Sequence, residues 1–132
     1  MLFRSNIVEA HTVVAACRSA VADCSSVLVW GWHPSIYVEL AQAPPTRHAI
    51  PHFLYTANPS SDFLRATFMQ DLSANRPKLI LELLGPLDYA FTPAPQFFPA
   101  LSQYVADNYT LAWTGTIPID DAEETLRIYR LR

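Results

Sequence analysis

The sequence predicts an α/β fold, a three-layer α/β/α domain built around a mostly parallel five-stranded sheet. Segments with apolar residues at helical spacing alternate with short apolar runs that are typical of buried parallel strands. The 132 residues are 51% hydrophobic and 16% charged, which is typical of one globular domain spanning residues 1–132. Right-handed crossovers give the strand order 2-1-3-5-4, with an antiparallel C-terminal hairpin at one edge.

A helix followed by a buried strand is expected at the start of the chain. Apolar residues recur at helical spacing over residues 7–23, and the β-branched run at 27–30 then predicts a strand. Cys17 and Cys24 fall seven residues apart in this predicted segment, which separates their Cα atoms by about 10 Å in a helix. That distance exceeds disulfide reach, so the spacing predicts two reduced thiols and leaves the redox compartment open.

The next two elements are short. Pro34 suits the first turn of a helix over residues 35–42, because the missing N–H costs nothing there. Two prolines end that helix. Residues 47–50, closed by Pro51, predict a short strand at the edge of the sheet.

A strongly amphipathic helix and an apolar strand follow in the middle of the chain. Residues 62–75 carry apolar side chains on one face, with Ser60 or Ser61 as the N-cap. The strand is expected over residues 78–84. The Pro-rich loop over 85–95 follows its carboxyl end, and loops of this length often carry function.

The last third predicts a helix and a hairpin. Pro99 starts a helix that reaches Asn108, and alternation predicts strands over residues 109–117 and 126–131. The acidic residues between 120 and 124 are interpreted as a solvated turn, because acidic blocks without a partner usually face water.

The bulk properties exclude several classes of protein. A formal charge of −3 and a pI near 5.7 argue against a nucleic-acid-binding protein, which needs clustered Lys and Arg. No apolar run approaches the roughly 20 residues that cross a bilayer, and Arg4 and Glu9 argue against a signal peptide. The default location is therefore cytoplasmic if Met1 is the natural start.

The turn after the first strand is the predicted ligand-binding region. Trp32, His33 and Tyr37 crowd the carboxyl end of that strand, where ligands bind in open α/β sheets, and Arg47 follows. Aromatic faces suit sugars and a guanidinium suits phosphate or carboxylate. The alternative for Arg47 is a local pair with Glu39 or a backbone carbonyl that pins the corner.

The chemistry-bearing motifs of common enzymes are missing. There is no G-x-G-x-x-G, no phosphate loop and no G-x-S-x-G elbow, so no catalytic residue and no cofactor is assigned. His33, His48 and His52 could converge at one end of the sheet, but Pro51 breaks the helical spacing of the last two. No metal site is therefore assigned.

Four segments carry a resemblance to a known family. They are the stretch from Val27 to Tyr37 (VLVWGWHPSIY), Arg47, the stretch from Asn75 to Ile80 (NRPKLI) and the stretch from Phe98 to Val105 (FPALSQYV). With the chain's terminal pattern, they resemble the C-terminal domain of polytopic C-type glycosyltransferases, the superfamily of protein mannosyltransferases and aminoarabinose transferases. His33 departs from the small or acidic residue expected at its position.

The resemblance implies an extracytoplasmic accessory domain that is not catalytic alone, because the family's catalytic carboxylates lie in membrane loops. Its partners would be the membrane portion of its own full-length chain and a polyprenyl-phosphate-linked sugar or an acceptor glycan. The alternative is a stand-alone cytoplasmic α/β module that binds a small ligand or a protein. A homodimer that buries Leu126, Ile128 and Leu131 of the last strand fits that alternative.

Overall fold

The computed structural model describes residues 2–31, 33–47, 59–84, 98–119 and 122–132. Within these residues, four strands form one mixed sheet in the order β1-β2-β4-β3. The strands are β1 (Val27–Trp30), β2 (Leu79–Leu84), β3 (Tyr109–Ile119) and β4 (Ala122–Leu131). The helices are α1 (Leu2–Ala20), α2 (Ser35–Leu40), α3 (Ser61–Asn75) and α4 (Pro99–Asn108).

The predicted five-stranded, mostly parallel sheet in the order 2-1-3-5-4 is wrong. Among the described strands, β1 and β2 alone are parallel, because β4 pairs antiparallel with both β2 and β3. The strand expected over 47–50 would have added a second parallel pair. Arg47 lies in a bend, and residues 48–50 lie outside the described part of the chain. The overall class is nevertheless α/β.

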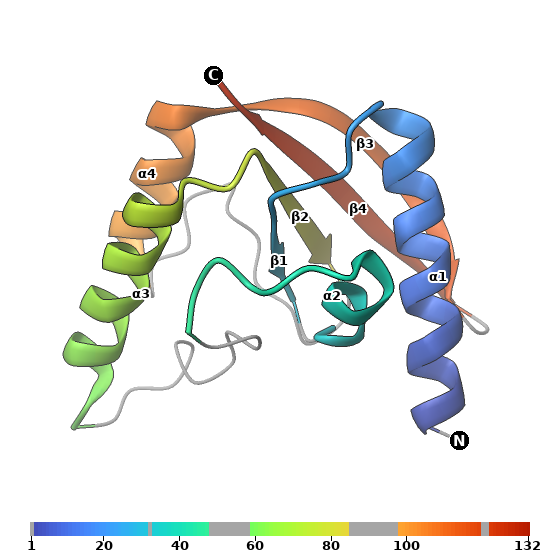
Figure 1. The fold of residues 1–132 in the computed structure, drawn as a ribbon, viewed down its shortest axis with the longest axis horizontal. Coiled ribbons are helices and arrows are strands. Elements are labelled where there is room, and N and C mark those ends of the chain that lie inside the picture. Colours follow the sequence, from blue (N-terminus) through green and yellow to red (C-terminus); the bar gives the residue numbers. More distant parts are fainter. Residues whose placement is uncertain (1, 32, 48–58, 85–97, 120–121) are drawn as a thin grey trace.

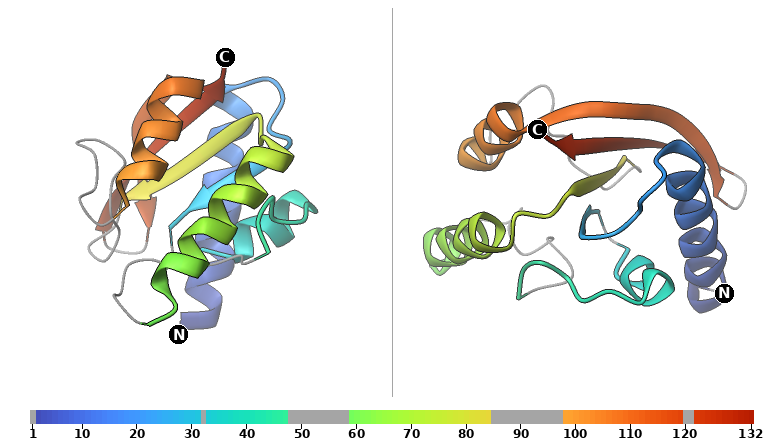
Figure 2. Two further views of the ribbon diagram at one scale, coloured as in Figure 1. Left: turned by 90° about the vertical axis from the view of Figure 1, so that its left-hand side faces the viewer. Right: turned by 45° about the horizontal axis from the view of Figure 1, so that its top comes forward.

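Helices cover both faces of the sheet (Figure 1), with α1 and α2 on one face and α3 and α4 on the other (Figure 2). The period of two along the strands makes this possible, because successive side chains of β2 point to opposite faces. Leu79, Leu81 and Leu83 pack under α1 and α2, whereas Ile80 packs under α3 and α4.

Helix α1 ends three residues earlier than the predicted 7–23 segment, and this corrects the interpretation of the cysteines. The chain leaves the helix after Ala20, so Cys24 turns back and its Cα lies 6.1 Å from that of Cys17. The two residues form a disulfide. The prediction of two reduced thiols was wrong because the distance of about 10 Å assumed a continuous helix.

The hairpin of β3 and β4 forms one side of the sheet, with β3 at the edge. Leu111 pairs with Tyr129 and Trp113 with Ile128, so Ala112 is an extra residue and β3 bulges there. Leu126 and Ile128 of β4 are fully buried in the core under α1. The apolar alternation that suggested a homodimer interface is therefore explained by burial of these two residues within the chain itself.

Candidate functional site

The predicted site begins at the turn that follows β1. Gly31 has a φ of 150°, and a Cβ at this position would lie 3.2 Å from both Leu83 Cβ and His33 Cδ2. A glycine therefore permits both the backbone conformation and the close packing of this turn against β2. Trp30 is fully buried on the other face of the sheet, and its ring meets that of Phe68 edge to face at 5.9 Å. Trp32 lies outside the described residues.

His33 lies beside a carboxylate that the sequence analysis had interpreted as solvated. Its Nε2 is 3.8 Å from Glu124 Oε2, and their side chains are only 11% and 15% exposed. Because β4 begins at Ala122, Glu124 is a strand residue that shares the alternation of Leu126 and faces inward. A solvated turn was therefore the wrong interpretation for this residue, while residues 120 and 121 lie outside the described part of the chain.

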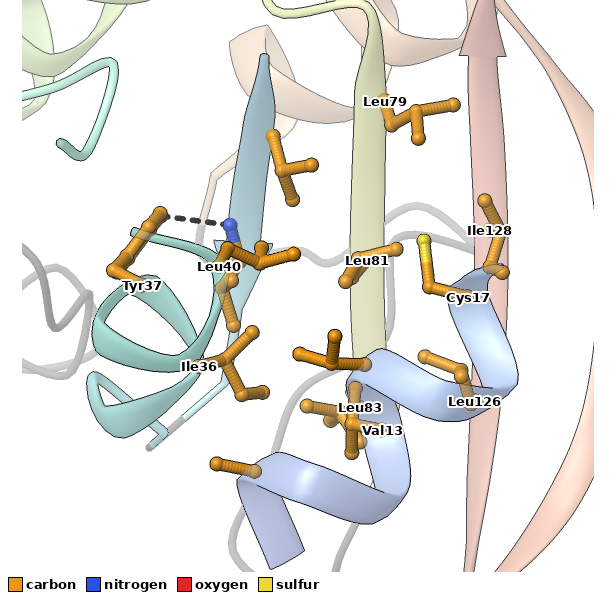
Figure 3. Packing of buried hydrophobic residues seen from close by; sticks show 14 of the residues in the cluster. Val13, Cys17, Ile36, Tyr37, Leu40, Leu79, Leu81, Leu83, Leu126 and Ile128 are labelled. Atoms are coloured by element: carbon orange, nitrogen blue, oxygen red, sulfur yellow. Dashed lines mark hydrogen bonds between the residues drawn. The ribbon is translucent and has the colours of Figure 1, made fainter. Parts of the chain in front are cut away.

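Tyr37 is a core residue. Its side chain is 4% exposed, and its hydroxyl accepts a 2.7 Å hydrogen bond from the Val29 N–H (Figure 3). Burial raises the pKa of the Tyr37 phenol well above its ordinary value, and the bond from Val29 opposes this weakly. Among the described strands β1 is the outermost on its side of the sheet, and Tyr37 supplies an acceptor for its Val29 N–H. Its ring stabilises the packing of α2 on β1.

Arg47 is held by α3. Its Nε and Nη2 donate 3.0 Å hydrogen bonds to the two carboxylate oxygens of Asp71, and its backbone N–H donates a third to the same side chain. The hydrogen bonds to Asp71 raise the pKa of Arg47, so its charge is permanent. The predicted alternative partner, Glu39, instead accepts a 3.1 Å bond from His11 of α1. Arg47 therefore fixes the segment after α2 to α3.

The three described residues of the predicted site are thus separated by their contacts. His33 meets β4, Tyr37 meets β1 and Arg47 meets α3. The structure does not bring them together into one binding surface.

A buried carboxylate that the sequence analysis missed lies at the centre of the sheet. Glu82 is 0% exposed and accepts hydrogen bonds from Arg127 Nη1 at 3.3 Å and from the Tyr129 hydroxyl at 3.2 Å. Arg127 is its cross-strand partner on β4. A charge inside the apolar run LILELL is the sequence signal that could have revealed this pair, because an isolated buried charge is costly.

The His33–Glu124 pair and the Glu82–Arg127 pair both lie near the carboxyl ends of β1 and β2, but on opposite faces of the sheet. Glu82 is in register with Trp30, the last residue of β1, and Arg127 is three positions after Glu124 on β4. A histidine near a carboxylate can exchange a proton, and a buried carboxylate can orient a cation or a hydroxyl. In the described part of the chain, no three His, Cys, Asp or Glu side chains are arranged to hold a metal ion. The loop expected over 85–95 lies outside the described residues.

Among the described helices, none combines the length and the apolar character needed to cross a bilayer. Comparison of the chain with protein-family models, with curated proteins and with solved structures found no match.

Proposed function

We propose that this chain is an extracytoplasmic accessory domain of a membrane glycosyltransferase that uses a polyprenyl-phosphate-linked sugar, and that it is not catalytic alone. The resemblance of its Trp-Gly-Trp-His-Pro, Asn-Arg-Pro and Phe-Pro segments to such domains supports the enzyme class. The Cys17–Cys24 disulfide is the observation that supports an extracytoplasmic location.

The disulfide favours an oxidising compartment. Cytoplasmic thiols are kept reduced, whereas disulfides persist on the extracytoplasmic side of membranes. Cys17 is fully buried in the core with residues of β2 and β4, and Cys24 is half-buried against it, so the bond ties the segment after α1 to the core. A bond in that position favours a compartment in which the chain folds with its thiols oxidised.

The outer side of α2 is the surface that we assign to the membrane portion of the same full-length chain. A shallow depression of about 470 Å³ lies there, lined mainly by apolar atoms of Pro34, Tyr37, Val38, Ala41 and Pro44. Val38 is 81% exposed, which is unusual for a β-branched apolar side chain on a short helix. Contact with another part of the enzyme would bury this side chain.

Arg47, which follows α2 in the chain, provides a test of the accessory role. We expect Arg47→Ala to leave the domain folded, because the Arg47 side chain is 58% exposed and belongs to neither hydrophobic cluster. Loss of the Asp71 contact would move the segment after α2 and impair sugar transfer by the full-length enzyme. Normal transfer by a correctly inserted Arg47→Ala enzyme would contradict the assigned role.

The decisive experiment is fractionation of the protein expressed from its native locus with a C-terminal tag. Recovery in the membrane fraction, at a mass far above 14.8 kDa and with the tag protected from cytoplasmic labelling, would support the proposal. Recovery as a cytoplasmic species of that mass would overturn it. The chain would then be a stand-alone module that binds a small ligand or a protein.

A further inference from the structure

A groove at the opposite end of the sheet from His33 is lined by an excess of positive charge. It has a volume of about 400 Å³ and lies between the turn that follows α1, the start of β2 and the end of β4. Its charged side chains are those of Lys78, Arg130 and Arg132, with Asp23 as the one acidic side chain among its lining residues. A chain with a formal charge of −3 thus concentrates three of its nine Lys and Arg residues in one groove.

The three cations are not neutralised by strong ion pairs. Lys78 Nζ is 3.9 Å from Asp23 Oδ2, but both side chains are about two-thirds exposed, and such pairs are weak. Arg130 is exposed and forms no ion pair with any residue that the structure describes. The positive charge of the groove is therefore available to a ligand.

The side chain of Arg132 is held in one orientation before any ligand binds. Its Nη2 donates to the Ala106 carbonyl at 2.6 Å and to the Tyr109 carbonyl at 3.2 Å. Both acceptors are neutral, so the guanidinium keeps its full charge while its orientation is fixed. Its position at the C-terminal end of α4 also suits a cation, because that end of a helix carries partial negative charge.

The backbone of the groove is fixed as well. The disulfide from Cys17 to Cys24 closes the loop that carries residues 21–23 of the groove wall. The Ser26 hydroxyl and carbonyl accept hydrogen bonds from the N–H groups of Lys78 and Leu79, which joins this wall to β2. The charged residues therefore project from a rigid frame, which lowers the entropy cost of binding.

We propose that this groove binds the phosphate group of an organic phosphate ester. Guanidinium groups bind phosphate oxygens through paired hydrogen bonds, and a lysine adds a point charge. Leu131, which is half-buried, also lines the groove, and its apolar side chain would contact the organic part of the ester. The same chemistry is presented by a soluble phosphate ester and by a lipid phosphate headgroup. This inference does not rest on the proposed function.

The test uses the full oxidised chain and two probes. Phenyl phosphate, with phenol as its neutral control, is titrated while backbone amide shifts are followed by NMR. Sedimentation with phosphatidylcholine vesicles, with and without phosphatidic acid, measures binding to a lipid headgroup. Saturable shifts confined to the groove, with no vesicle binding, would identify a soluble phosphate ester as the ligand. Retention by the phosphatidic acid vesicles would identify the lipid headgroup.

Two exposed positions permit variants that leave the fold intact. Lys78→Gln and Arg130→Gln remove one charge each, and each should weaken phenyl phosphate or vesicle binding about fivefold. Arg18→Gln is the matched control, because Arg18 is exposed on α1 and does not line the groove. The absence of saturable binding to either probe, or an equal loss in the Arg18→Gln chain, would overturn the proposal.

Discussion

Loss of the Cys17–Cys24 disulfide should destabilise this chain by about 2.5 kcal/mol. The two cysteines are separated by 7 positions, so the bond closes a loop of about eight residues. The loop-closure relation converts that length into about 8 cal/mol/K of entropy removed from the unfolded chain. For a domain of 132 residues, the same loss lowers the melting temperature by about 10 °C.

Reduction of the disulfide tests the predicted loss of about 2.5 kcal/mol without creating a cavity, because both sulfur atoms stay in the protein. Urea unfolding of the oxidised and the reduced chain is followed through the fluorescence of the three Trp residues. In the Cys17→Ala/Cys24→Ala variant, the unfolding midpoint should not respond to the reductant. The reasoning is refuted if the oxidised and reduced parent chains unfold at the same urea concentration.

Three further predictions concern buried polar groups. Tyr37→Phe removes the acceptor of the Val29 N–H and should lower the free energy of unfolding by about 1–3 kcal/mol in urea titrations. Burial raises the pKa of Tyr37 and Tyr109 above 10.0, so the folded chain holds these protons more tightly than the unfolded chain. The two protonated phenols therefore make their full contribution to the free energy of unfolding below about pH 10, and this contribution is lost as the pH rises further. A Tyr37→Phe chain whose stability falls as steeply as that of the parent above pH 10 would contradict this assignment. Arg127→Met leaves the Glu82 carboxylate buried without that cation and should cost about 3 kcal/mol, whereas Arg127→Met/Glu82→Leu should recover most of the loss.

The positions of most helices and strands could be predicted from periodicity. Apolar residues at helical spacing located α3 over Ser61–Asn75, and Pro99 marked the first residue of α4. The β-branched run located β1 over Val27–Trp30. These signals are local, since they depend on which face of each element is buried, and one sequence contains them in full.

The errors arose where the structure depends on the residue at which a helix ends or on the residue that lies across the sheet. The end of α1 differs by three residues from its predicted position, and this small difference converts two separate thiols into a disulfide. Glu82 is stable in an apolar strand because Arg127, 45 residues later, meets it across the sheet. Local spacing indicates neither the residue at which α1 ends nor the partner of Glu82.

The contacts of the candidate site residues could not be predicted from the sequence. Tyr37 and Arg47 were chosen for their chemistry and their closeness in sequence to the first turn. The structure satisfies each of them with a partner that sequence spacing does not indicate, the Val29 N–H for one and the Asp71 carboxylate for the other.

The bulge in β3 has a consequence for how copies of this domain meet one another. An edge strand of 11 residues offers backbone groups that another chain could extend into a continuous intermolecular sheet. The extra residue Ala112 interrupts the regular spacing of those groups, and Pro118 lacks the N–H that a neighbouring strand would need. The long strand is therefore a poor template for polymerisation, and many copies can be crowded together without forming fibres along this edge.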